Sequence, residues 1–250
     1  MTILKDITDL KVTQIRVFPV DVVPLGMITT KSCIEKIRGD LSVSQIESPP
    51  FIEGIGPIIF LRGEIKEGNR IIVINRIAVE HRRIILEVVG TSKETDHVYD
   101  VLLSSIASVT DIDSGRLRVP LLIAETTQCV ATLDFHFESL FNNSFIELLN
   151  NRVRKEATNK IAKGSVRPLV AEVEISYQIK DKTLIKNSIS MSPKKFTIAP
   201  RAGTPLEARR YFLSSPFDSD THLNLVRGLE EAITKTSQVG NQGSKTVVRP

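Results

Sequence analysis

The residue types best suited to chemistry in this chain lie within the segment Asp134-Phe135-His136-Phe137-Glu138. We expect this segment to be a strand, on which Asp134, His136 and Glu138 would project to one face. Two carboxylates and an imidazole on one face could ligate a divalent metal or form a carboxylate–histidine pair for acid–base catalysis. An amphipathic strand with a solvated face would show the same alternation. That plainer interpretation is favoured, so we expect no cofactor and keep the three residues as the candidate metal ligands.

Recognised catalytic motifs are missing from the rest of the sequence. It contains no GxSxG nucleophile elbow, no P-loop, no GxGxxG and no HExxH. The segment Asp218-Ser219-Asp220 resembles half of a calcium loop but lacks the glycine and the distal glutamate, and helix capping explains it. The sequence therefore favours a non-enzymatic protein. A metal-dependent enzyme centred on Asp134, His136 and Glu138 is one alternative.

Two basic segments could bind an anion or a partner protein. Arginine and lysine side chains cluster at 152–167, on a helix end and the loop after it, and a second group lies at 201–211. Such side chains bind carboxylates and phosphates through charge-assisted hydrogen bonds. The candidate contact residues are Arg154, Lys155, Lys163, Arg167, Arg201, Arg209, Arg210 and Tyr211.

Composition narrows the class of protein. The 250 residues are 41% hydrophobic, with 33 basic and 29 acidic residues and a net charge of +4, a small excess that only weakly favours polyanions as partners. Two cysteines without a CxxC indicate neither a disulfide framework nor a zinc site. The N-terminal segment lacks the apolar region of a signal peptide, and no apolar stretch approaches the ~20 residues of a membrane-spanning helix. We expect a cytoplasmic protein that does not enter a membrane.

Hydrophobic periodicity predicts the order strand, helix, three strands and helix within a first module, residues 1–112. Gly68 and Asn69 favour a hairpin turn, because both residue types tolerate positive φ. Thr91 and Glu94 fit a capping box at the start of the last helix. The predicted strands cover 13–23, 58–65, 70–79 and 83–89, and the predicted helices cover 31–38 and 92–109.

The same order recurs in a second module, residues 113–235, with corresponding pieces offset by roughly 111 residues. An insertion loop at 200–219 interrupts this module, and 236–250 is predicted to be a flexible tail. The clearest strand is 169–178, where apolar side chains alternate with largely polar ones. The predicted strands cover 119–138, 169–178, 183–191 and 195–199, and the predicted helices cover 144–157 and 220–234. The apolar side of the first of these helices carries Phe145, Leu148, Leu149 and Val153.

Each module would form an antiparallel sheet with one face covered, because two helices cannot cover both faces. We therefore predict an α+β fold of two tandem, similar β-α-β-β-β-α modules that form a pseudo-symmetric antiparallel sheet with helices on one face. This duplicated order, with a hairpin opening at Pro57 and again at Pro168, resembles the topology of saddle-shaped TATA-binding-protein-like folds. Helix-grip folds use related orders. The resemblance is one of element order, which does not carry a function with it.

The charges expected on the open sheet face bear on the kind of partner. A saddle that binds DNA through its sheet needs a basic face with apolar or aromatic wedges. The residues expected there are mixed in charge: Arg62, Glu64, Arg76, Glu87, Asp134, Glu138, Glu172, Glu174 and Lys186. Carboxylates repel phosphate, so we predict a binding or assembly subunit that contacts another protein or a copy of itself. A nucleic-acid-binding accessory protein that uses 152–167 and 201–210 is the other alternative.

Overall fold

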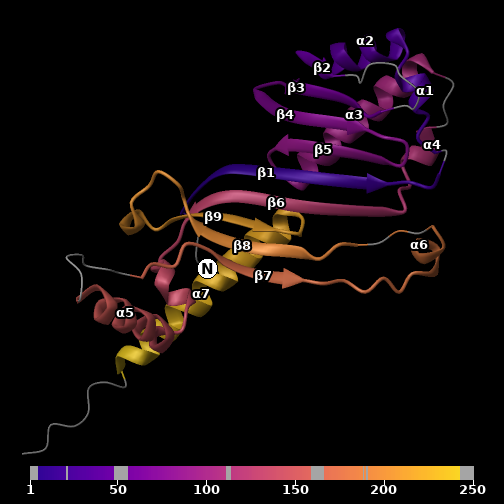
Figure 1. The fold of residues 1–250 in the computed structure, drawn as a ribbon. Helices are drawn as coiled ribbons and strands as arrows, with labels where there is room; N and C mark the ends of the chain where they lie inside the picture. Colours follow the sequence, from indigo (N-terminus) through magenta and orange to yellow (C-terminus); the bar gives the residue numbers. More distant parts are fainter. Residues whose placement is uncertain are drawn as a thin grey trace, which may run out of the picture.

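The computed structural model describes residues 5–20, 22–47, 56–110, 114–158, 166–187, 189 and 191–242. These residues form one nine-stranded antiparallel sheet with the order β2-β3-β4-β5-β1-β6-β9-β8-β7 (Figure 1). The fold is α+β. The strands are β1 (Lys5–Val17), β2 (Gln45–Glu47), β3 (Ile58–Glu67), β4 (Arg70–Val79), β5 (Arg83–Val89), β6 (Leu122–Thr132), β7 (Ala171–Ile175), β8 (Lys194–Pro200) and β9 (Arg210–Ser215).

The helices differ widely in length. Within the described residues, none is both long and apolar enough to cross a membrane. The α-helices are α1 (Leu25–Ile28), α2 (Lys31–Asp40), α3 (Ser92–Val109), α4 (Ser114–Leu117), α5 (Asn143–Thr158), α6 (Lys182–Lys186) and α7 (Ser219–Gln242), and the 3-10 helices are η1 (Phe137–Leu140) and η2 (Leu206–Ala208). The end of α7 enters the segment predicted to be a tail, and residues 243–250 lie outside the described part.

The hairpins of the first half follow the predicted alternation. The predicted β3, β4 and β5 are confirmed, because Ile58, Phe60 and Leu86 face the core while their neighbours along each strand are more exposed. The predicted α3 is also confirmed. Its capping box is present, with the Thr91 side chain accepting from the Glu94 amide and the Glu94 carboxylate accepting from the Thr91 amide.

β1 begins earlier and ends earlier than the predicted strand at 13–23. It stops at Val17, because Pro19 has no amide proton to donate to a neighbouring strand. Its N-terminal part pairs with β6 through two register shifts, and Asp6 and Asp9 there take positive φ. These irregularities let the strand continue through a sequence whose alternation is broken. β1 pairs along residues 11–17 with β5 and along residues 5–17 with β6.

Three predictions in the second half are wrong. β6 ends at Thr132, so the predicted strand through Glu138 does not form. The predicted strand at 183–191 is replaced by α6, because the Asp181 carboxylate accepts from the amides of Thr183 and Leu184 and caps a helical turn. The predicted insertion loop contains β9, which supplies the strand beside β6.

α3 and α7 cover the same face of the sheet. Gln14 of β1 and Glu125 of β6 are direct cross-strand partners, so their side chains share a face. Gln14 contacts Asp96 of α3. Cys129 follows Glu125 by four residues on β6 and therefore lies on the same face, where it contacts His222 of α7. Buried apolar side chains form one core cluster that includes residues of α2 and α3 and a second one that includes Val226 of α7.

Candidate interaction surface

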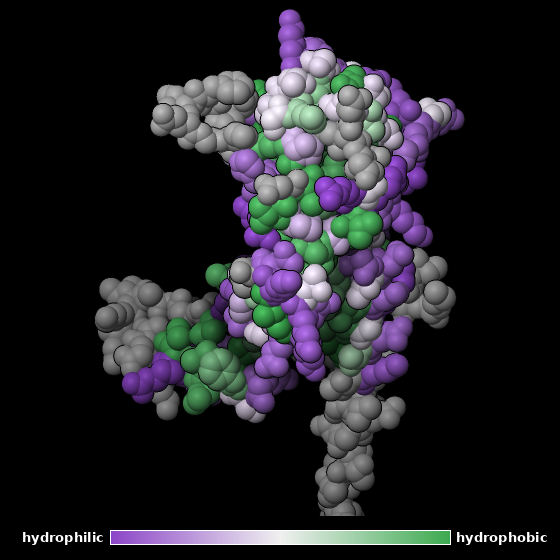
Figure 2. All heavy atoms as spheres, turned by 90° about the vertical axis from the view of Figure 1, so that its right-hand side faces the viewer, coloured by the Kyte–Doolittle hydropathy of each residue, from purple (hydrophilic) through white to green (hydrophobic). Residues whose placement is uncertain are grey.

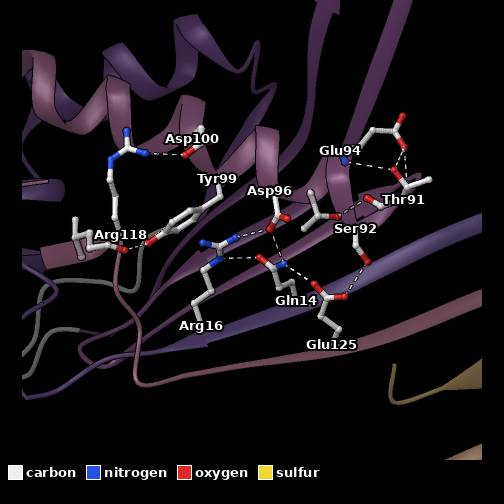
Figure 3. Close-up of polar contacts among 12 residues, drawn as sticks. Gln14, Arg16, Thr91, Ser92, Glu94, Asp96, Tyr99, Asp100, Arg118 and Glu125 are labelled. Carbon is white, nitrogen blue, oxygen red and sulfur yellow. Dashed lines mark hydrogen bonds and ion pairs between the residues drawn. The ribbon is translucent and has the colours of Figure 1, made fainter. Parts of the chain in front are cut away.

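A partly buried polar network connects β1, β6 and α3 (Figure 3). Gln14 Nε2 donates to Glu125 Oε1 at 2.6 Å and to Asp96 Oδ1 at 2.9 Å. The Arg16 Nε donates to Gln14 Oε1 at 2.7 Å, and its guanidinium forms an ion pair with Asp96. The guanidinium also lies over the Tyr99 ring, 3.7 Å from the ring centroid. The protein itself therefore supplies several partners for the Arg16 cation.

The N-termini of α3 and α7 meet at the same place. The Ser92 amide donates to Ser219 Oγ at 3.0 Å, and the Ser219 amide donates to Ser92 Oγ at 2.9 Å. Ser92 Oγ in turn donates to Glu125 Oε2 at 2.8 Å. Two positive helix ends thus face one carboxylate of the chain. A place that could attract an external anion is already occupied by Glu125, and the network serves as the junction between the halves.

A cysteine, a histidine and a serine meet inside the second half. Cys129 Sγ lies 3.3 Å from His222 Nε2, and Ser215 Oγ lies 2.7 Å from His222 Nδ1. Burial raises the pKa of Cys129 to about 11 and lowers the pKa of His222 to about 4. A nucleophilic cysteine needs a lowered thiol pKa and access to substrate. These buried, neutral groups are part of the core. Sequence reasoning missed the contact, because no local spacing connects the three residues.

The candidate metal ligands do not lie on one strand face. β6 ends before them, Asp134 and His136 are exposed, and Glu138 belongs to η1. His136 Nε2 lies 3.0 Å from Nη2 of Arg209. Across the part of the chain that the structure describes, no three His, Cys, Asp or Glu residues are grouped as metal ligands would be. The strand geometry on which the metal hypothesis rested is therefore wrong.

Three of the candidate contact residues come together at the β8–β9 connection beside β1. Arg201 Nη2 lies 3.5 Å from Asp9 Oδ2, and Arg210 Nη2 donates to Thr8 Oγ1 at 2.7 Å. Arg209 contacts His136, as described above. All three side chains thus contact the protein itself while lying near its surface.

Tyr211 has a different position from the arginines beside it. Its side chain is buried, and its hydroxyl donates to the Phe135 carbonyl at 2.7 Å. Its ring stacks with the rings of Phe135 and Phe137, with centroid distances of 5.5 and 5.8 Å. Burial raises the pKa of Tyr211 to about 12. Tyr211 is therefore a core residue of the second half.

The remaining candidates belong to the segment around α5. Arg154 on α5 and Arg167 ahead of β7 are exposed. Lys163 and the side chain of Lys155 lie outside the described residues. Arg154 therefore lies on α5, and Arg167 lies just before β7, close in sequence to the exposed apolar residues described next.

Exposed apolar side chains gather on α5 and around β7. We call them the second-half apolar surface. Leu148 is 65% exposed and Val173 is 61% exposed. In Figure 2, hydrophobic side chains cover part of the arm that projects at the lower left, over α5. The members of the surface are Phe145, Leu148, Leu169, Val170 and Val173.

β3 and β7 are each the fourth strand counted outward from the central pair, but β3 is flanked by β2 and β4 whereas β7 is at the edge of the sheet, and their coverage by helices differs. In β3, Phe60 is 0% exposed and belongs to the core cluster that also contains Ile37 of α2. In β7, Val173 pairs with Phe196 of β8 on the helix-covered face of the sheet and is nevertheless exposed. The sequence predicted an apolar side for α5 but gave no sign that part of it lacks cover.

No protein-family model matches this chain, and no curated protein matches it in sequence.

Proposed function

We propose that this protein is a non-enzymatic binding or assembly subunit that contacts a protein partner through the second-half apolar surface. The exposure of Val173, on a sheet face that is covered elsewhere, carries the proposal. Exposed contiguous apolar residues on a globular protein mark interaction sites more often than isolated ones do. The buried, neutral state of Cys129 and His222 supports a role without catalysis.

We also propose that the chain consists of two similar modules. Read outward from the central pair, the sheet order is β1-β5-β4-β3 on one side, where the short β2 is added at the edge, and β6-β9-β8-β7 on the other. Gln14 and Glu125 are direct partners and are 111 positions apart, the same spacing as the predicted offset between modules. A pseudo-two-fold axis between them would also relate Ser92 to Ser219, whose reciprocal hydrogen bonds support the idea. Two buried free thiols, Cys33 and Cys129, support a reducing, cytoplasmic setting.

The second candidate function is nucleic-acid binding through the basic segments 152–167 and 201–210. The meeting of Arg201, Arg209 and Arg210 at one connection favours it. Asp9, which pairs with Arg201, reduces the positive charge there. Binding to phosphates would weaken steeply with salt, whereas binding through apolar side chains would not.

The test compares capture of partners by the wild-type protein and by a variant with both Leu148→Glu and Val173→Glu. Both side chains are exposed, so the fold should be retained, and circular dichroism checks this. The matched control is Val119→Glu, because Val119 is 73% exposed and lies outside the second-half apolar surface. We expect the double variant to retain less than about one tenth of the bound protein, since each buried charge costs roughly tenfold or more in affinity.

The control should capture as much protein as the wild type. Equal capture by all three proteins would contradict the proposal. Loss of bound nucleic acid on a high-salt wash, with no effect of the double variant, would support the second candidate instead.

A further inference from the structure

We propose that the protein partner is a second copy of this chain, and that α5 of each copy packs on the helix-side face of β7 in the other. This inference rests on the proposed function and identifies its partner. In such a two-fold pair, two equivalent contacts form, because α5 of each copy covers β7 of the other.

In the first half, a helix covers β3, the strand that corresponds in position to β7. α2 lies between β1 and β3 in the chain and buries Cys33 and Ile37 in the same cluster as Ile58 and Phe60 of β3. The corresponding order in the second half is β6, α5, β7. In Figure 1, α5 lies beyond the end of the sheet and does not cover β7. β7 is therefore left without the helix cover that β3 has in the first half.

α5 carries two apolar stripes. Ile146, Leu149 and Val153 follow a three- and four-residue spacing and are half-buried. Phe145 and Leu148 form the neighbouring stripe and are exposed. The half-buried stripe thus packs within the chain, and the exposed stripe is available to a partner.

β7 provides a matching apolar face. Its only pairing among the described residues is with β8, and Ala171, Val173 and Ile175 share its helix-side face. Ala171 packs at the edge of the second core cluster, next to Ile198. An apolar helix stripe laid on Val173 would continue this core outward. Burial of apolar residues in an interface of this kind is typical of permanent homodimers.

One hydrogen bond favours a second copy over closure of α5 on its own strand. The Val166 amide donates to Asn150 Oδ1 at 2.9 Å, which ties the chain entering β7 to the middle of α5. The bond adds to the contacts of α5 in its present place, where Leu148 is exposed. A helix from another copy can reach β7 without breaking it.

The test is cross-linking between two variants that each carry one introduced cysteine, Leu148→Cys and Val173→Cys. The native Cys33 and Cys129 are buried, so the introduced thiols are the reactive ones. One variant carries an affinity tag that changes its mass, the two are mixed by co-expression in the same cells so that mixed dimers can assemble, and a short bis-maleimide reagent is added after purification. We expect a covalent heterodimer in the mixture. Val119→Cys mixed with Val173→Cys is the control, since Val119 is exposed but lies elsewhere.

A heterodimer yield at least about tenfold above the control would support the inference. A yield equal to the control would overturn it. So would an intrachain cross-link in the Leu148→Cys/Val173→Cys double variant whose yield is unchanged on dilution, because it would show closure within one chain. If a different protein is captured through Leu148 and Val173 and no heterodimer forms, the inference fails while the proposed function stands. If neither occurs, both fail.

Discussion

Replacing Arg16 with Met should lower the free energy of unfolding by about 3 kcal/mol. The Arg16 side chain is 9% exposed and contacts Gln14, Asp96 and the Tyr99 ring. Its removal leaves the buried Gln14 Oε1 without its donor and removes the cation from the ring. Removing one member of a buried charged pair costs about 3–5 kcal/mol, and the lower end applies because Asp96 is 55% exposed and water can solvate it.

Urea unfolding followed by circular dichroism measures this effect. Arg118→Met is the matched control, because Arg118 forms an exposed ion pair with Asp100 at 3.1 Å (Figure 3). We expect the control to lose less than about 1 kcal/mol, as exposed ion pairs contribute little. Equal losses in the two variants would show that the network is not a structural junction.

Acidification from about pH 7 to about pH 5 should destabilise the protein by about 2 kcal/mol through His222 alone. Burial lowers the pKa of His222 to about 4 in the folded protein, whereas an unfolded histidine has a pKa of ~6.5. Between these values the unfolded chain binds a proton and the folded protein does not. The stability contributed by the neutral imidazole is therefore present above the unfolded pKa and is lost as the pH falls toward the folded pKa.

The measurement compares urea unfolding of the wild type and of His222→Gln at both pH values. Glutamine retains a donor and an acceptor for Ser215 and Cys129 but does not titrate. The wild type should lose about 2 kcal/mol more than the variant on acidification. An identical pH dependence for both proteins would mean that His222 is not buried as described.

The hairpins of the first half could be predicted because their signals are local. Residues 58–89 alternate clearly around Gly68 and Asn69, and Thr91 with Glu94 marks the start of α3. β9 could not be predicted in this way. It starts directly after Arg209, whose φ of 50° sets a tight turn, and it is short and lies within a segment rich in turn residues.

The network and the apolar surface depend on long-range packing. Gln14 meets Asp96 and Glu125 only because the sheet order places β1 beside β6. Amphipathicity predicts that α5 packs on something, but it does not specify whether the apolar side chains pack within the chain or on a partner. The position of Leu148 on the apolar side of its helix could therefore be predicted, whereas its exposure is known only from the structure.

Light scattering on the intact protein, over a range of concentrations, tests the central claim most directly. The account predicts a mass of twice 27.8 kDa for the wild type and for Val119→Glu. It predicts a monomer of 27.8 kDa for the variant with both Leu148→Glu and Val173→Glu. A wild-type protein that remains a monomer at every concentration, or a double variant that dimerises as well as the wild type, would contradict it.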